Sequence, residues 1–153
     1  MRVMHRTLRT LLVFVLLAAA AGFAADTPLA AEWRKKAEAG DAASQELRGE
    51  CYADDASSDG IPLDFAEAVK WFRKAAEQGR AKAQYNLGLM YDKGEGVPKD
   101  LVQAHVWWNI AGAKGDEDAK KNLGIIEKQM TDSQKEKAMD LARELFAKLP
   151  KGN

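Results

Sequence analysis

Cysteine and histidine are scarce in this chain, and their scarcity removes several kinds of chemistry. The 153 residues contain one cysteine, Cys51, and two histidines, of which only His105 lies beyond residue 24. A lone cysteine cannot form an internal disulfide, and one histidine with one distant cysteine cannot supply the ligands of a usual zinc site. One histidine also does not suggest a Ser-His-Asp arrangement. We therefore predict no catalytic residues, no metal site and no cofactor, and we interpret His105 as a solvated helix residue.

Long apolar runs are missing too, with one exception near the start. Residues 2, 6 and 9 are arginines that precede an apolar run over residues 11–21, and small residues follow it. This order is typical of a secretory signal peptide, and the run is shorter than the ~20 residues of a membrane-spanning helix. We predict a signal peptide over residues 1–24, with an uncleaved membrane anchor as the alternative. The mature protein is then expected to be periplasmic or secreted, with no stable membrane insertion.

The chain also lacks an excess of basic residues. Removing residues 1–24 takes away three of the 23 Lys and Arg residues and none of the 23 Asp and Glu residues. The remaining 20 basic and 23 acidic side chains give a net charge of −3. A basic patch is the electrostatic footprint of a nucleic-acid-binding protein, so we predict no nucleic-acid partner.

What the sequence does contain is a repeat. Residues 60–64, Gly-Ile-Pro-Leu-Asp, return as residues 96–100, Gly-Val-Pro-Lys-Asp, and the same offset of 36 residues (96 minus 60) relates Trp71 to Trp107. An earlier half-copy begins at Trp33, at an offset of 39 residues from the next copy. Self-similarity at such a period indicates a solenoid, in which each unit buries its apolar face against its neighbours.

The repeated segments have the apolar spacing of helices that need partners. In the central copy small and large residues share one helix face at Ala83, Leu87, Gly88 and Tyr91. Asp100 stands at an N-cap position, and Thr131 and Gln134 have capping-box spacing. The expected helices cover residues 29–38, 41–53, 64–78, 81–93, 100–114, 116–129 and 132–148. The last has no repeat signature and is expected to cap the stack, with a packed side made of Ala138, Leu141, Ala142, Leu145 and Phe146.

These motifs resemble the units of the Sel1-like repeat family. Such units combine an Ala-x-x-x-Leu-Gly-x-x-Tyr helix, a Gly-x-Gly-Val-x-x-Asp turn and an Ala-x-x-Trp-x-x-x-Ala-Ala-x-x-Gly helix. The central copy matches all three parts, at Ala83, Leu87, Gly88, Tyr91, Gly94, Gly96, Val97, Asp100, Ala104, Trp107 and Ala111. The preceding copy departs at Ser44 and Arg48, where the family has alanine and leucine.

The resemblance, to a secreted bacterial-type member of the family, implies an all-α fold. The expected architecture is a short right-handed α-solenoid of Sel1-like, tetratricopeptide-like (TPR-like) helical hairpins with a C-terminal capping helix. The domain order is then a signal peptide, a repeat array, and a capping helix with a tail, at residues 1–24, 25–130 and 131–153. The clearest units are residues 41–79 and 80–115, and a partial unit covers residues 116–130.

The resemblance also implies a protein-protein interaction module or adaptor that binds a peptide or protein on a concave helical surface. Binding residues are expected on the side of each first helix that packing does not use. In the central copy these residues are Lys82, Tyr85, Asn86, Leu89 and Lys93. The counterparts of Tyr85 and Leu89 differ in kind, being Glu46 and Glu50 in one copy and Lys121 and Ile125 in the other. The alternative is that Tyr85 and Leu89 only pad the neighbouring helix.

Two other functions stay open. A cell-wall or polysaccharide-acting enzyme or accessory would use a carboxylate pair, such as Glu67 with Glu77 or Asp116 with Asp118. A self-associating structural repeat protein is the other alternative, because a short array leaves both of its ends to be covered. The oligomeric state is left open.

Three further features are interpreted as structural. Cys51 aligns with apolar residues in the other copies and is expected to be a buried, inert thiol. The four tryptophans are expected to pack, and if one of them is partly exposed we expect it to be Trp108. Residues 55–60 imitate the start of a calcium loop, but its twelfth position is Ala66, where a bidentate glutamate is needed. We therefore predict no calcium site.

Overall fold

The chain folds into α-helices joined by short links. The computed structural model describes residues 28–54 and 63–150, and the predicted signal peptide and the calcium-loop-like residues 55–60 lie outside these ranges. The helices are α2 (Pro28–Glu38), α3 (Ala42–Ala53), α4 (Phe65–Glu77), α5 (Ala81–Lys93), α6 (Leu101–Ala113), α7 (Glu117–Ile126) and α8 (Asp132–Lys148). Each lies close to a range expected from the sequence, and the described ranges contain no strand.

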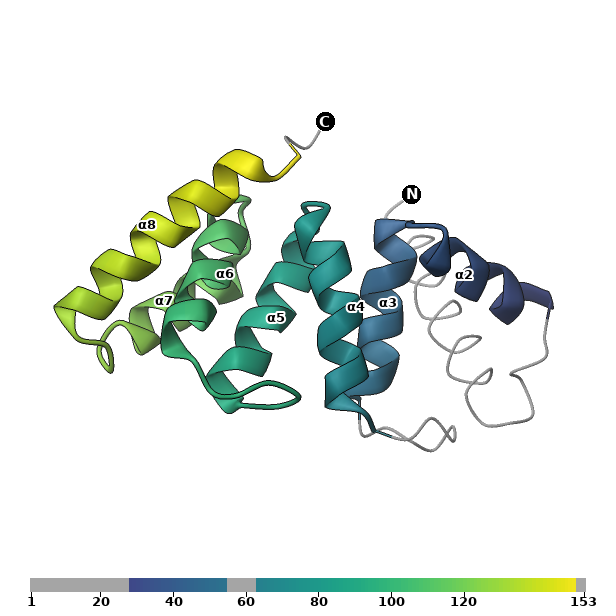
Figure 1. Cartoon of the computed structure of the whole chain (residues 1–153), viewed down its shortest axis with the longest axis horizontal. Coiled ribbons are helices and arrows are strands. Elements are labelled where there is room, and N and C mark those ends of the chain that lie inside the picture. Colours follow the sequence, from purple (N-terminus) through teal and green to yellow (C-terminus); the bar gives the residue numbers. More distant parts are fainter. Residues whose placement is uncertain (1–27, 55–62, 151–153) are drawn as a thin grey trace.

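The helices pair and stack in the order of the chain. Helix α3 packs against α4, and α5 packs against α6, while contacts between α4 and α5 join the two pairs. Figure 1 shows the resulting row of helices, with α2 at one end and α8 at the other. Because the helices from α2 to α7 contact chiefly their neighbours along the chain, the fold is a short α-solenoid, and the predicted fold class is confirmed.

Polar side chains define the first residues of most helices. Four helices begin after an aspartate whose carboxylate accepts a hydrogen bond from a backbone N–H of the first turn: Asp41, Asp64, Asp100 and Asp116. At the start of α8, Thr131 and Gln134 form the predicted capping box. These caps satisfy N–H groups that have no partner inside the helix, which is why the helix starts agree with the sequence.

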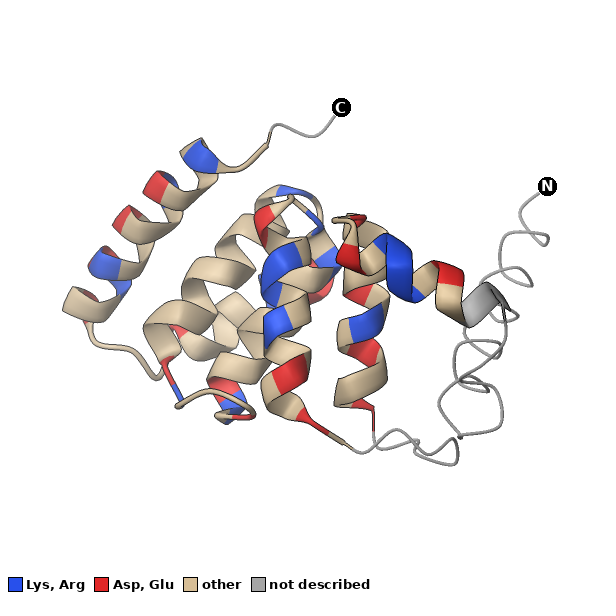
Figure 2. Ribbon diagram, turned by 45° about the vertical axis from the view of Figure 1, so that its right-hand side comes forward, with Lys and Arg blue, Asp and Glu red and all other residues tan. Residues whose placement is uncertain are grey.

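Helix α6 forms the centre of the core. It contains no Lys, Arg, Asp or Glu, and its ribbon is uniformly tan in Figure 2. Helices α5, α7 and α8 all pack against it. Its buried side chains include Trp107, Trp108 and Ile110. Because three helices surround α6, side chains all around it are removed from water rather than those of one face alone.

The tryptophans pack, but the one that keeps partial exposure is Trp33, so the choice of Trp108 is wrong. Trp108 is 2% exposed, and its indole Nε1 donates a hydrogen bond to the carbonyl of Tyr85 at 3.1 Å. Trp108 lies against Gly88 of α5, where a missing side chain makes room for the ring. Trp71 and Trp107 are also buried, whereas Trp33 keeps partial exposure on the terminal helix α2.

Helix α8 closes the stack by packing on α6. Ala138 and Ala142 are buried, and the packed line continues to Leu149. The placement of Phe146 on this side is wrong, because Phe146 and Met139 are 48% and 49% exposed. These two residues stand seven apart, hence on one helix face, about a quarter turn from the line that touches α6.

Two glutamines tie each helical pair to the helix before it. The Nε2 atom of Gln45 donates to the carbonyl of Ala37 at 3.0 Å, and Gln84 donates to Ala76 at 2.9 Å. The two contacts are related by the 39-residue offset of the repeat. Both glutamines are buried, so each side chain satisfies a helix carbonyl that water cannot reach.

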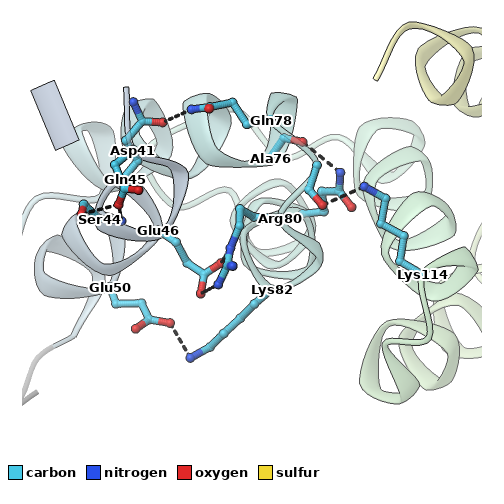
Figure 3. A network of polar contacts seen from close by, with 12 residues as sticks. Asp41, Ser44, Gln45, Glu46, Glu50, Ala76, Gln78, Arg80, Lys82 and Lys114 are labelled. Carbon is cyan, nitrogen blue, oxygen red and sulfur yellow. Dashed lines mark hydrogen bonds and ion pairs between the residues drawn. The ribbon is translucent and has the colours of Figure 1, made fainter. Parts of the chain in front are cut away.

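A second repeated contact joins the turns between the pairs. Gln78 donates to the carbonyl of Gly40 at 2.9 Å and to the side chain of Gln45 at 2.8 Å, as Figure 3 shows in part. At the equivalent place one unit later, Lys114 Nζ donates to the carbonyl of Gly79 at 2.7 Å. Burial of the ammonium lowers the pKa of Lys114. The turns therefore hold successive units in register through side chains that the family motif does not specify.

Candidate functional site

The five residues predicted to bind a partner lie along one side of α5. Lys82 and Lys93 are exposed near its two ends, and Tyr85, Asn86 and Leu89 are partly buried between them. Tyr85 and Leu89 also pack in part against the core. The structure thus gathers all five on one helix side, and their role in binding stays a prediction. We call the partner face the surface made by this side of α5 together with the equivalent sides of α3 and α7.

Ion pairs link α3 to α5 at one end of the partner face. The carboxylate of Glu46 accepts two hydrogen bonds from Arg80, at 2.9 Å from Nε and 3.1 Å from Nη2. One turn further along α3, Glu50 lies 2.6 Å from Lys82 Nζ. Figure 3 shows the two pairs side by side between the helices. The hydrogen bond to Glu46 raises the pKa of Arg80. The charged side chains at this end are therefore already paired with one another within the protein.

The two ion pairs are expected to contribute differently to the free energy of unfolding. The Glu46 side chain is 9% exposed and that of Arg80 is 41% exposed, whereas the values for Glu50 and Lys82 are 29% and 60%. Replacing Arg80 by alanine leaves a nearly buried carboxylate unpaired, which we expect to lower the free energy of unfolding by about 2 kcal/mol after allowance for solvent screening. The matched change Lys82→Ala is expected to cost about 0.5 kcal/mol or less. Urea denaturation followed by circular dichroism measures both, and equal effects contradict the interpretation.

The other end of the partner face carries apolar surface. Ile125 of α7 occupies the repeat position of Leu89 and is 58% exposed, the largest exposed fraction among the large apolar side chains of the described residues. Lys121, one turn earlier, occupies the position of Tyr85 and lies 3.0 Å from Asp118. The hydrogen bond to Asp118 is the chief cause that raises the pKa of Lys121, and Tyr85 contributes in the same direction. The repeat thus places Lys121 and Ile125 of α7 at the positions that Tyr85 and Leu89 occupy on α5.

The interpretation of His105 as a solvated residue is wrong. Its side chain is 1% exposed, and its Nε2 atom lies 3.0 Å from a carboxylate oxygen of Glu127, just beyond α7. Its Nδ1 atom has no hydrogen-bond partner among the described residues. His105 projects from α6 where the end of α7 covers that helix. The His105 imidazole therefore has a packing role, in which Glu127 supplies its polar contact.

The surroundings of Cys51 favour the predicted unreactive thiol, although Cys51 is half-buried rather than fully buried. Burial raises the pKa of its thiol to about 11, with a further contribution from the negative charge of Glu50. Near neutral pH the sulfur therefore stays protonated, and the thiolate that attacks electrophiles or binds metals is scarce.

Arg48 shows how the chain accommodates a charge where the family has leucine. Its guanidinium carbon lies 4.3 Å from the centre of the Trp71 ring, and its Nη1 atom is 3.1 Å from Glu38. Lys74 also lies against Trp71, at 4.2 Å from the ring centre. A cation over an indole face is attractive and lets the alkyl stem pack. Arg48 thus packs against Trp71 and pairs with Glu38 where the family has a leucine. Sequence spacing alone does not reveal these contacts.

Three of the four carboxylates that the sequence offered for catalysis make ordinary helix contacts. Asp116 caps α7 through the N–H of Ala119 at 2.8 Å, and Asp118 pairs with Lys121. Glu67 forms an ion pair with Lys70 on the surface of α4. In the ranges that the structure describes, no three His, Cys, Asp or Glu side chains gather as ligands of a metal ion, and no helix is long and apolar enough to cross a membrane.

Helical pairs stacked in series define the class of this protein, an α-solenoid repeat protein. The family model of the Sel1 repeat matches residues 42–79 and 81–116, which cover the α3–α4 and α5–α6 pairs. The chain therefore belongs to the Sel1 repeat family. Sel1 repeats are generally protein-protein interaction modules. No curated protein sequence matches the chain.

Solved structures support the same assignment. The chain is 35% identical to a protective antigen present in uropathogenic Escherichia coli strains that displays an SLR fold, with a TM-score of 0.72 over 78% of this chain. It is 33% identical to a Sel1 repeat protein from Oxalobacter formigenes, with a TM-score of 0.60 over 73% of this chain. The match covers 26% of the first protein and 33% of the second. The chain thus spans about a quarter to a third of the length of these two neighbours.

Proposed function

We propose that the protein is a periplasmic or secreted binding module that holds a protein or peptide partner on the partner face. The observation that carries the proposal is the exposed Ile125 on α7, at the repeat position of the partly exposed Leu89 on α5. Exposed apolar side chains that share a surface favour association with another protein. The general role of Sel1 repeats in protein interactions supports the same function.

The charges around this surface restrict where the partner sits. Glu46 and Glu50 are already paired with Arg80 and Lys82, so the α3 end offers little unsatisfied charge. The α7 end combines Ile125 with exposed lysines, among them Lys128. We therefore place the contact between α5 and α7, and we expect the partner to present an apolar side chain next to a negative charge.

A crosslinking pull-down from the native envelope tests the proposal. Protein expressed from the full-length chain is compared with an Ile125→Glu variant, which places a charge on the proposed contact without entering the core. Met139→Glu is the matched control, because Met139 is similarly exposed but lies on α8. We expect the parent and the control to capture the same defined partner and Ile125→Glu to capture about tenfold less or none.

Two results of this experiment count against the partner face. Equal capture by both variants means that the contact lies elsewhere. Absence of capture by the parent contradicts a protein partner and directs attention to cell-wall fragments and the enzyme alternative. Sedimentation of the parent over a range of concentrations separates binding of a different protein from self-association, which requires a concentration-dependent mass.

A further inference from the structure

A second candidate site lies away from the partner face, in a hollow of about 500 Å³ between α4 and α6. Arg73 and Glu77 of α4 line one side, Gln103 and Trp107 of α6 line the other, and Tyr91 of α5 lies between. Tyr91 follows Lys82 by nine residues, about two and a half helical turns, so the two residues project from opposite sides of α5. We call this site the α4–α6 hollow. It is separate from the surface of the proposed function.

Arg73 is the feature of the hollow that most needs an explanation. Its Nη2 atom donates a hydrogen bond to the Tyr91 hydroxyl at 2.6 Å, and no carboxylate of the described residues pairs with it. By contrast, the guanidinium groups of Arg48, Arg80 and Arg143 each pair with a carboxylate. A guanidinium has five N–H donors in a planar fork. Tyr91 therefore holds Arg73 in place and leaves most of that fork available to a ligand.

The remaining groups of the hollow favour a carboxylate with a neighbouring N–H donor. The acidic group of Asp100 already caps α6, where it accepts hydrogen bonds from the N–H groups of Val102 and Gln103 at 2.9 and 3.0 Å. Glu77 has no partner among the described residues and can accept a hydrogen bond from a ligand. Trp107 adds an aromatic wall. An acidic residue in an extended peptide presents this combination, because its carboxylate is close to backbone N–H groups.

We propose that the α4–α6 hollow binds a carboxylate of an extended peptide, which Arg73 receives in its bidentate fork while Tyr91 orients the guanidinium. Planar bidentate recognition of this kind is the strongest polar contact that an arginine makes with a carboxylate. The carboxylate comes from an acidic side chain or from a chain terminus. Glu77 accepts a hydrogen bond from an N–H of the same peptide, and Lys99, which also pairs with Asp92 at 3.8 Å, lines the hollow.

Nuclear magnetic resonance titration of ¹⁵N-labelled protein, expressed from the full-length chain, tests the proposal with three peptides. The first, acetyl-Ala-Ala-Glu-Ala-Ala-amide, carries a side-chain carboxylate. The second, acetyl-Ala-Ala-Gln-Ala-Ala with a free C-terminus, carries a terminal carboxylate. The third, acetyl-Ala-Ala-Gln-Ala-Ala-amide, carries none. We expect at least one charged peptide to shift the Trp107 indole N–H and the amides of Tyr91 and Gln103, and the uncharged peptide to leave them unchanged.

Variants connect those shifts to the proposed contacts. Arg73→Gln is expected to weaken the charged peptide about tenfold or more, Arg73→Lys to restore only part of the affinity, and Tyr91→Phe to weaken it severalfold. Arg143→Gln on α8 is the matched control and is expected to bind as the parent does. Ile125→Glu is also expected to bind normally, so a failure of the partner face leaves this result intact.

Three outcomes overturn the proposal. These are equal shifts with the uncharged peptide, unchanged affinity in Arg73→Gln, and no shift with either charged peptide at millimolar concentration. If only one charged peptide binds, the proposal stands and the source of the carboxylate is identified. Backbone spectra of each variant without peptide show whether it keeps the parent fold, and Tyr91→Phe retains the ring that packs against the core.

Discussion

Replacing Gly96 by alanine is expected to lower the free energy of unfolding by about 3 kcal/mol or more. Gly96 lies in the link between α5 and α6 with a φ angle of +70°, a conformation that residues with a side chain rarely adopt. A Cβ atom there would overlap the carbonyl group of Phe65, the first residue of α4. This obstacle is backbone rather than a movable side chain, so relief requires the link to shift away from the neighbouring unit.

Gly94 provides the matched control for this change. It lies in the same link with a φ angle of +75°, but a Cβ atom there would come no closer than 3.3 Å to Lys99. Gly94→Ala therefore carries the conformational cost, about 1–2 kcal/mol, without the overlap. Urea denaturation followed by circular dichroism at a helix wavelength measures both variants. Similar losses in the two would contradict the close approach of the link to α4.

The second large effect is expected at Gly88 in the middle of α5. A Cβ atom there would overlap the indole of Trp108, which lies across the glycine and donates its hydrogen bond to Tyr85. We expect Gly88→Ala to lower the free energy of unfolding by about 2 kcal/mol, since overpacking outweighs the gain in helix propensity. The intrinsic fluorescence of the tryptophans is expected to change as well, because the Trp108 ring must move.

The repeat contains its own control for Gly88. Gly124 of α7 is the equivalent residue 36 positions later, and a Cβ atom at Gly124 would meet no other atom within 4 Å. Gly124→Ala is therefore expected to stabilise the protein by about 0.5–1 kcal/mol through helix propensity alone. Opposite signs at two equivalent residues are the expected result of the denaturation measurements. A loss at Gly124 as large as that at Gly88 would show that the aromatic contact is not the cause.

The comparison of Gly88 with Gly124 also shows what a repeat motif specifies. The motif glycine is required where an aromatic residue of the following helix lies against it, as Phe72 lies against Gly49 in the first unit. The equivalent place beside Gly124 is open because α8, which has no repeat signature, packs on α6 instead. Glycine at the same repeat position thus affects stability differently in successive units, and only the packing around each glycine shows the difference.

The candidate sites followed from the sequence to different degrees. The spacing along α5 placed Lys82, Tyr85 and Leu89 on one side of a helix, because a helix face is a local property of the chain. The ion pair between Glu46 and Arg80 joins residues 34 apart, and nothing in the spacing of either residue indicates it. The contact between Arg73 and Tyr91 is likewise a product of the way α4 lies beside α5.

Local signals in the sequence by themselves determined the helices, their caps, the period of the repeat and hence the α-solenoid. Each of these depends on residues that are close along the chain, where spacing and hydrogen-bonding groups decide the outcome. Only the tertiary structure decided that His105 and Trp108 are buried, that Phe146 is exposed and that a hollow opens between α4 and α6. The physical reason is that α6 is covered by α5, α7 and α8 together, and burial depends on all of its neighbours rather than on the pattern of α6 alone.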